Sequence, residues 1–161
     1  MNIPRLKDML RRHEGVRRKA YRCTKGHWTI GVGWNLDAHK PHSDIDSYLH
    51  IHGEITNEMI ERLLDVSVNA TLRNCHDTWP RFDTFSENRQ IALADFMFNL
   101  GVTKEKEFKN TNRAINEGRW EDAARGIQNS LYYRQLGGDP PGTNDGRLER
   151  PEEICMMIRE G

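Results

Sequence analysis

Apolar side chains in the first fifteen residues recur at helical spacing. They lie at Ile3, Leu6, Met9 and Leu10. Pro4 occupies a position tolerated in a first helical turn, and Gly15 is a common type of helix end. The pattern predicts a helix over about 3–15 with Glu14 in its last turn. The C-terminal end of a helix disfavours negative charge, so this position favours a protonated carboxyl group.

From Tyr21 to Leu36 the period changes from helical to alternating. Large apolar residues alternate with small or polar ones at Trp28, Ile30, Val32 and Trp34. Lys25-Gly26 is typical of a turn, so a β-hairpin is predicted. Thr29, Gly31 and Gly33 then share one strand face, where a polymer could approach the backbone closely.

The remainder of the chain is polar at first and then helical. Residues 37–54 hold four of the seven histidines and predict a surface loop with some helix. Thr56 is a candidate N-cap for a helix to about Cys75, of about 20 residues or roughly 30 Å. Later helices are predicted over Ser86–Leu100, 108–116, 119–130 and 151–159, with a loop at 137–142. The predicted class is α+β, mainly α.

Composition narrows the class of protein. Hydrophobic residues are 36% and charged residues 30% of the 161. No segment reaches the roughly 18 apolar residues of a membrane span, and the N-terminus shows no apolar signal core. We therefore expect synthesis in a cytoplasm.

Charge is balanced overall but unevenly placed. Residues 1–25 contain nine Lys or Arg and two acids, although the net charge of the chain is zero. Such a basic segment would attract an anionic polymer, either peptidoglycan or nucleic acid, or it could simply form a solvated helix face.

Cysteines and histidines do not form a recognisable metal pattern. Cys23, Cys75 and Cys155 are an odd number without paired spacing, and the latter two are expected to be buried thiols. The histidine spacings do not match a zinc site, and no phosphate-binding glycine loop is present. We expect no metal, no cofactor and no nucleic-acid partner.

One constellation could carry chemistry. Glu14 precedes the hairpin, which carries Cys23 and Thr29. A lone carboxyl group against a hairpin suits protonation of a glycosidic oxygen. Cys23 could be a buried thiol, a nucleophile partnered by His27 or His13, or a group that orients water. No third group that would orient such a histidine is evident in the sequence. Thr29 is either a plain strand residue or a hydroxyl that positions water.

These residues also resemble the active-site segment of the T-even phage-type lysozymes, which are phage endolysins. In that family a Glu is followed after eight residues by Asp or Cys, and after five more by Thr, as in Glu14, Cys23 and Thr29. Other segments also resemble sequences of this family, namely residues 9–15, 29–37, 97–101, 119–124, 130–135 and 147–150. The resemblance thus runs through nearly the whole chain.

The resemblance implies a lysozyme-like two-lobe fold with a small β-hairpin lobe. Its expected parts are an N-terminal lobe over about 1–55, a connecting helix over about 56–76 and a helical lobe over about 77–161. The implied reaction is hydrolysis of the β-1,4 bond between N-acetylmuramic acid and N-acetylglucosamine in peptidoglycan, causing host cell lysis. The alternative is a peptidoglycan-binding module without catalysis.

The resemblance also implies roles for particular residues. Glu14 would be the general acid, while Cys23 and Thr29 would hold or activate water on the opposite face, as in an inverting mechanism. Arg147 would be a partner of Glu14. The sugar cleft would be lined by Asn99, Phe98 and Met97. Cys23 stands where the best-known members have Asp, and Trp34 where others often have His or Arg.

Cellular expectations follow from the same resemblance. The protein would be made in the host bacterial cytoplasm and act on peptidoglycan in the periplasm after the membrane is permeabilised. Export would depend on a holin, and a monomer is expected.

Overall fold

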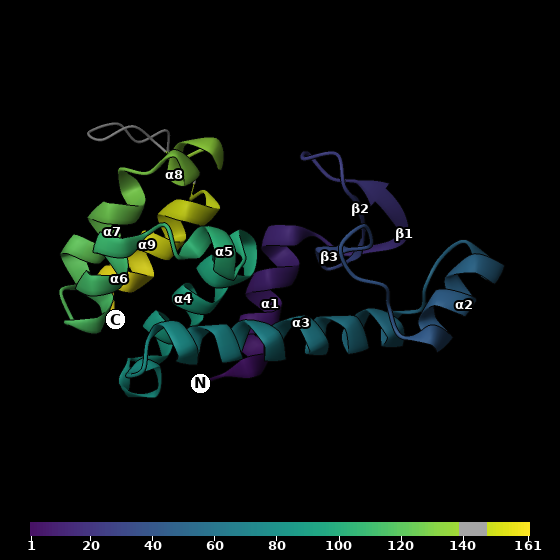
Figure 1. The fold of residues 1–161 in the computed structure, drawn as a ribbon, viewed down its shortest axis with the longest axis horizontal. Helices are drawn as coiled ribbons and strands as arrows, with labels where there is room; N and C mark the ends of the chain where they lie inside the picture. Colours follow the sequence, from purple (N-terminus) through teal and green to yellow (C-terminus); the bar gives the residue numbers. More distant parts are fainter. Residues whose placement is uncertain (139–147) are drawn as a thin grey trace. The chain divides into compact units, whose positions relative to one another are not determined.

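A computed structural model describes residues 1–138 and 148–161 (Figure 1). The strands are β1 (Arg17–Arg22), β2 (Trp28–Gly31) and β3 (Trp34–Asn35), in one antiparallel sheet of order β1-β2-β3. The helices are α1 (Ile3–Glu14), α2 (Ser43–His52), α3 (Asn57–Thr78), η1 (Phe82–Thr84), α4 (Glu87–Leu100), α5 (Val102–Glu105), α6 (Lys109–Asn116), α7 (Trp120–Gln128), α8 (Leu131–Gln135) and α9 (Arg150–Glu160). The predicted α+β, mainly helical class is confirmed.

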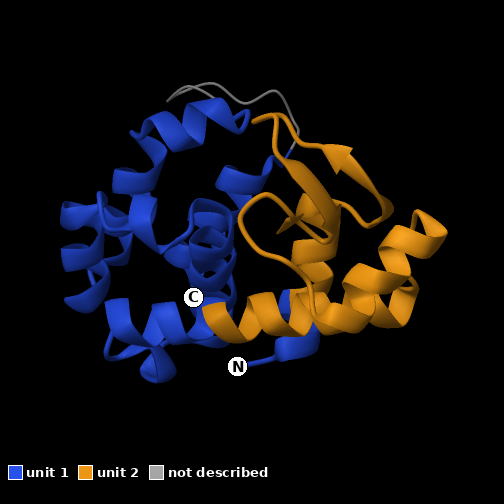
Figure 2. Ribbon diagram, turned by 45° about the vertical axis from the view of Figure 1, so that its right-hand side comes forward, with its two compact units in different colours: residues 1–6, 71–161 blue, residues 7–70 orange. Residues whose placement is uncertain are grey.

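The chain divides into two compact units, coloured separately in Figure 2. Unit 1 comprises residues 1–6 and 71–161, and unit 2 comprises residues 7–70. The long helix predicted after Thr56 is confirmed as α3, whose residues are shared between the two units. Its start is fixed by the Thr56 hydroxyl, which accepts a hydrogen bond from the Met59 amide at 3.2 Å.

Unit 2 is built on aliphatic side chains from its sheet and its helices. They include Ile30 and Val32 of the hairpin region and, from the helices and the segment between them, Met9, Leu10, Ile45, Ile55, Ile60, Leu63 and Leu64. All are buried, and each such side chain contributes roughly 1.5–3 kcal/mol relative to its exposed state. This core supports the sheet and therefore the hairpin.

The prediction of one alternating strand through Trp34 is wrong beyond Gly31. Gly31 and Gly33 have φ angles of +65° and +69°, which are left-handed conformations that side chains with a Cβ atom rarely adopt. The chain therefore turns over Gly31–Gly33, and Trp34 begins β3, opposite Ile30. The expected shared face of Thr29 and the two glycines does not form, because the glycines make a turn.

Unit 1 is a cluster of helices around α9. α9 packs against α4 and α7, and α6 packs against α7. As predicted, Ser86 caps the start of α4 with its hydroxyl, which accepts a hydrogen bond from the Arg89 amide, and Gly101 follows the last residue of the helix. Inside the cluster Arg150 Nε donates to Asp95 Oδ1 at 2.7 Å, an ion pair between α9 and α4. The short helices α5 and α8 were not predicted, and 139–142 of the predicted loop lie outside the described residues.

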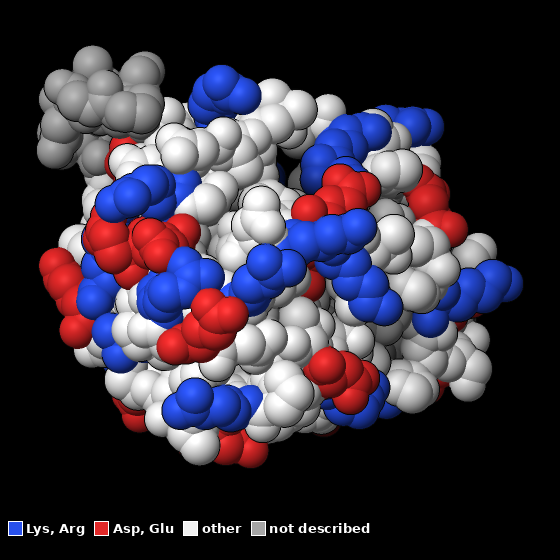
Figure 3. Space-filling view, turned by 60° about the vertical axis from the view of Figure 1, so that its left-hand side comes forward, with Lys and Arg blue, Asp and Glu red and all other residues white. Residues whose placement is uncertain are grey.

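Many bases of the N-terminal segment have acidic partners. In unit 1, Arg5 lies 3.4 Å from Glu87. In unit 2, the residues paired with acids are Lys7 with Glu61 and Asp65, Arg11 with Asp8 and Glu61, and Arg18 with Glu54. Figure 3 likewise shows Lys and Arg interspersed with Asp and Glu over one face. The excess positive charge of residues 1–25 is therefore neutralised in part by acids from later in the chain.

The His-rich stretch contains a regular helix, α2. Its C-terminal end is closed by Gly53, at a φ of +72°. Among the helices of the described residues, none has the length and apolar character needed to cross a membrane.

Candidate active site

Glu14 is the last residue of α1. Gly15 follows with a φ of +74°, and its amide donates to the Arg11 carbonyl oxygen at 3.0 Å, which closes the helix. The helix end thus sets the direction of the chain on both sides of Glu14. This placement agrees with the sequence prediction.

The carboxyl group of Glu14 lies against the backbone of Gly33. A Cβ atom built on Gly33 would lie 3.2 Å from Oε2 and 3.3 Å from Cδ of Glu14. Such distances are tighter than ordinary van der Waals contact, so any side chain at residue 33 would have to displace the carboxyl group. The turn after β2 therefore forms one wall of the site around Glu14.

Cys23 and Thr29 lie on neighbouring strands of the hairpin. Tyr21 is opposite Thr29 in the register, and the Cys23 amide donates to the His27 carbonyl oxygen at 2.9 Å, so pairing continues past β1. The Gly26 amide donates to the Cys23 carbonyl oxygen at 2.8 Å, which confirms the predicted turn at Lys25-Gly26. Alternate residues of a strand point to one face, so Tyr21, Cys23 and Thr29 share a face of the sheet.

The Cys23 thiol is surrounded by hydrogen-bond donors. Partial burial raises its pKa, but the backbone amides of His27 and Lys25, the Thr29 hydroxyl and the Lys25 charge together bring the pKa below its ordinary value. Thr29 Oγ1 also lies 3.1 Å from the His27 carbonyl oxygen. Since a hydroxyl has one proton, Thr29 can donate to this carbonyl beside a neutral thiol and to sulfur beside a thiolate.

Sequence reasoning assigned no role to Tyr21, which belongs to the same group. Burial raises the pKa of its phenol, the negative charges of Glu14 and Cys23 raise it further, and Arg17 opposes them. The Arg17 guanidinium carbon lies 5.4 Å from the centre of the Tyr21 ring. The sequence contained one indication of this: Tyr21 lies two residues before Cys23, so in a strand both side chains are on the same face.

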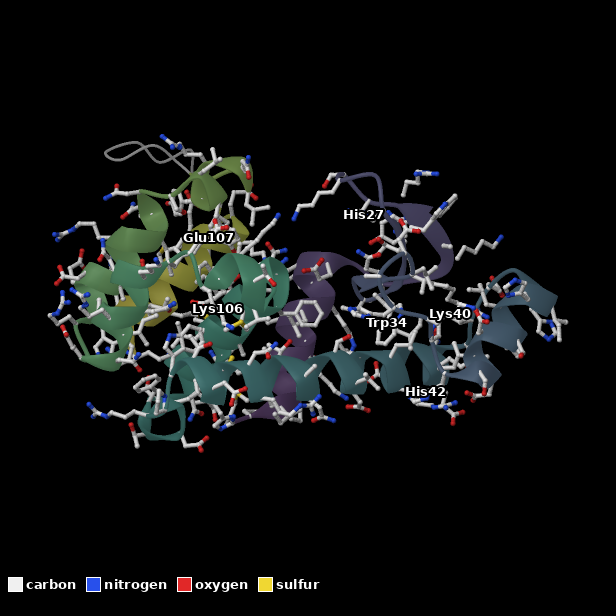
Figure 4. The ribbon with its side chains drawn as sticks, in the orientation of Figure 1. His27, Trp34, Lys40, His42, Lys106 and Glu107 are labelled. Atoms are coloured by element: carbon white, nitrogen blue, oxygen red, sulfur yellow. The ribbon has the colours of Figure 1, made fainter. Side chains whose placement is uncertain are left out.

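A third group does lie beside one of the two histidines considered as a partner of Cys23. His27 Nδ1 is 3.6 Å from Asp37 Oδ2, and that oxygen also accepts the Trp28 amide at 2.9 Å. Figure 4 labels His27 at the hairpin and Trp34, the first residue of β3. The separation of His27 Nδ1 from Asp37 Oδ2 is longer than a hydrogen bond, so Asp37 lies near His27 without fixing the orientation of its ring.

The remaining predicted site residues belong to unit 1. Met97, Phe98 and Asn99 lie in the last turns of α4; Met97 is buried with 1% of its surface exposed, and the other two are half-buried. Arg147 lies outside the described residues. Within unit 2 the structure brings Cys23 and Thr29 into contact, and it places Glu14 against Gly33 in the turn that follows β2. The roles of all seven residues stay predictions.

Among the described residues, no group of three or more His, Cys, Asp or Glu is arranged to hold a metal ion. The polar groups near Glu14 instead come from one sheet, its turns and one helix end. This donor set suits proton transfer and water orientation.

The chain is similar in sequence to several known proteins. The chain is 26% identical over 151 residues to probable T4-type lysozyme 2 of Dictyostelium discoideum, covering 83% of this chain and 87% of that protein. It is 28% identical to the pre-baseplate central spike protein Gp5 of Enterobacteria phage T4, covering 96% of this chain but 27% of that protein. It is 32% identical over 97 residues to an endolysin of Acyrthosiphon pisum secondary endosymbiont phage 1, covering 59% of this chain and 56% of that protein.

The sequence model of the family described as phage lysozyme matches residues 11–145. This match includes the helix end, the hairpin and most of the helical unit, and it supports a glycoside hydrolase that lyses peptidoglycan. The chain belongs to the phage lysozyme family.

Proposed function

We propose that this protein hydrolyses the β-1,4 bond between N-acetylmuramic acid and N-acetylglucosamine in peptidoglycan, and so causes host cell lysis. The observation that carries the proposal is the Glu14 carboxyl group at the helix end, held against Gly33 beside the hairpin that joins Cys23 to Thr29. A protonated carboxyl group and a separate polar pair are the two parts that glycoside hydrolysis requires.

In this mechanism Glu14 is the general acid. It gives its proton to the glycosidic oxygen as the bond from that oxygen to the anomeric carbon breaks. A water molecule adds to the anomeric carbon from the opposite side and loses a proton. Attack from that side inverts the configuration of the sugar, so the β-linked glycan releases the α anomer.

Cys23 and Thr29 are assigned to the water. A thiolate can accept the proton that the water loses, and the lowered pKa of Cys23 increases the thiolate fraction at neutral pH. The Thr29 hydroxyl fixes the position of the sulfur and of the water through hydrogen bonds. In this role Cys23 accepts a proton from water, which a carboxylate at the same position could also do.

Residues outside unit 2 complete the proposal. Asn99, Phe98 and Met97 are assigned to sugar binding and Arg147 to support of Glu14. The protein acts as a monomer on peptidoglycan in the periplasm. It is synthesised in the host cytoplasm and depends on a holin to cross the inner membrane.

The first test is release of reducing ends from purified Gram-negative sacculi by the wild type, Glu14→Gln and Glu58→Gln. Glu58 is an exposed glutamate of α3, so its variant controls for loss of a carboxylate elsewhere in unit 2. We expect Glu14→Gln to lose activity by roughly 100-fold or more, since general acid catalysis typically contributes that much. Near-normal release of reducing ends by folded Glu14→Gln would contradict the proposed mechanism.

Cys23 variants separate its alternative roles. Cys23→Asp should retain activity if the residue positions or deprotonates water, while Cys23→Ser should fail if the thiol is a nucleophile. NMR detection of the first anomer released decides the stereochemistry, and a β anomer would contradict inversion.

The alternative function, a binding module without catalysis, has its own outcome. Such a protein would bind sacculi and release no reducing ends with either wild type or Glu14→Gln. The same experiment therefore decides between the two functions.

A further inference from the structure

Asp37 contacts the hairpin in a way that the proposed mechanism does not use. It lies in the loop after β3, and its Oδ2 accepts the Trp28 amide at 2.9 Å. That amide belongs to the peptide group that joins His27 to Trp28. Because the imidazole of His27 lies farther away, 3.6 Å from the same oxygen, Asp37 holds the hairpin through the backbone and not through this ring.

The carbonyl oxygen of the same peptide group is contacted by both residues that are assigned to the water. It accepts the Cys23 amide at 2.9 Å, and Thr29 Oγ1 lies 3.1 Å from it. A peptide group is planar, so its N–H and its carbonyl oxygen cannot turn independently of each other. The Asp37 carboxyl group therefore holds one side of the group, while Cys23 and Thr29 bind the other side.

Asp37 is brought to Trp28 by a closed turn. Asn35 Oδ1 accepts the amides of Asp37 at 3.0 Å and of Ala38 at 3.1 Å. The Leu36 amide donates to the Trp28 carbonyl oxygen at 2.8 Å, which continues the pairing of β3 with β2. The carboxyl group thus has a defined place beside the hairpin, although 46% of the Asp37 side chain is exposed.

We propose that Asp37 is a positioning residue of the hydrolysis, because it fixes the peptide group to which both water-holding residues are bonded. This inference rests on the proposed function of Cys23 and Thr29. The fixed carbonyl oxygen orients the Thr29 hydroxyl directly, and it orients Cys23 through the amide of that residue. A water molecule held by this pair is then kept in one direction from the anomeric carbon, as attack on that carbon requires. Asp37 does not itself exchange a proton with water or substrate.

This role predicts a loss of rate with little loss of binding. Cys23 and Thr29 are assigned to the water and not to the sugar, so displacing them should lower kcat and leave KM nearly unchanged. The contact is a hydrogen bond accepted from a backbone amide. An Asn side chain keeps an acceptor oxygen in the same place, so it should replace Asp37 in large part.

The test compares reducing-end release by Asp37→Ala, Asp37→Asn and Asp65→Ala. Asp65 is an exposed residue of α3 in the same unit and pairs with Lys7, so its variant controls for loss of a surface carboxylate. We expect Asp37→Ala to lower kcat about 10-fold with KM within about twofold, the size of a lost hydrogen bond to a charged group. Asp37→Asn should recover most of the kcat, and Asp65→Ala should match the wild type. A wild-type kcat in folded Asp37→Ala, a loss confined to KM, or an equal loss in Asp37→Asn would overturn the role.

A second measurement is independent of activity. Amide hydrogen exchange followed by NMR should show faster exchange of the Trp28 and Cys23 amides in Asp37→Ala than in the wild type, with no change in Asp65→Ala. Unchanged exchange at both amides would show that Asp37 does not fix the peptide group, and would overturn the proposal.

The two measurements also separate this proposal from the proposed function. If the wild type releases no reducing ends, the proposed function fails and the positioning role fails with it. If the wild type is active and folded Asp37→Ala is equally active, the positioning role alone fails.

Discussion

The Glu14 carboxyl group occupies the space that a side chain on Gly33 would need. A Cβ atom there would lie 3.2 Å from Oε2 of Glu14, and the φ of Gly33 is +69°. Two separate demands, a left-handed backbone and a close neighbour, therefore require glycine at this position. Because residue 33 has no side chain, the carboxyl group of the candidate general acid can lie directly against the backbone there.

Gly33→Ala should consequently reduce activity beyond its effect on stability. Gly53 provides the control, since its φ is +72° and nothing lies within 4 Å of a Cβ atom built there. Both variants should lose about 1–2 kcal/mol of unfolding free energy from backbone strain. Only Gly33→Ala should lose reducing-end release in the fully folded protein. Equal activity of the two folded variants would show that the contact with Glu14 is irrelevant.

The three thiols should differ sharply in reactivity. Cys75 and Cys155 are buried, and burial raises the pKa of Cys155 to about 12 and that of Cys75 further still, whereas Cys23 is partly exposed with a lowered pKa. Iodoacetamide at pH 8 should therefore modify Cys23 alone in the native protein and all three cysteines in urea, as read by mass spectrometry. Native labelling of Cys75 at a similar rate would contradict the buried environment.

His76 should make stability depend on pH near neutrality. Its Nε2 lies 3.0 Å from Asp83 Oδ1 and its Nδ1 lies 2.7 Å from the Leu72 carbonyl oxygen, so both nitrogens face acceptors. The hydrogen bond to Asp83 raises the pKa of His76 above its ordinary value, while desolvation partly opposes it.

The raised pKa sets the direction of that dependence. The added stability is fully present below the unfolded pKa of about 6.5 and is lost as pH rises through the folded pKa. Urea unfolding at pH 5.5 and pH 8.5 should show this loss in wild type but not in His76→Gln. The effect should stay below about 1 kcal/mol, because the pair is exposed to solvent and screened. A larger loss in His76→Gln than in wild type would contradict the assignment.

Glu105 should destabilise the protein as pH rises. The residue is fully buried at the end of α5, and neither carboxyl oxygen has a hydrogen-bond partner among the described residues. Burial raises its pKa, and Asn112 and Lys106 nearby counteract this only in part. The folded state therefore binds the proton more tightly than the unfolded state, and stability falls as pH rises above about 4.3.

Glu105→Leu should therefore stabilise the protein at pH 7 by about 1–3 kcal/mol, with a smaller gain at pH 4. Glu107→Leu is the matched control, because Glu107 lies two residues further on and is exposed (Figure 4). Denaturant unfolding at both pH values measures the difference. A gain that is the same at pH 4 and pH 7 would mean that side-chain packing, and not the buried charge, is responsible.

The sequence predicted best where the signal was local and repeated. The helices begun by Thr56 and Ser86 were placed correctly, since a capping hydroxyl and apolar periodicity pointed to the same start. The turn at Gly31–Gly33 was missed because large and small residues keep alternating along the sequence through it. The left-handed φ of both glycines is a property of the folded backbone and cannot be read from that alternation.

The candidate site, too, could be predicted from the sequence only in part. Glu14, Cys23 and Thr29 could be proposed from spacing, and the helix end and hairpin place them as expected. Tyr21, Asp37 and Gly33 were not assigned, because their importance comes from register, a loop contact and a close approach. Such features depend on tertiary structure, which residue type alone does not encode.

The groups around Glu14 are neighbours along the chain as well as in space. Glu14, the hairpin and Gly33 span a short continuous segment within unit 2, so few residues must be ordered to bring them together. Loop-closure entropy grows with the length of chain enclosed, and contacts this local are among the quickest to form. Substitutions among the helices of unit 1 should therefore change how much enzyme is folded, while the geometry between acid and hairpin survives in each folded molecule.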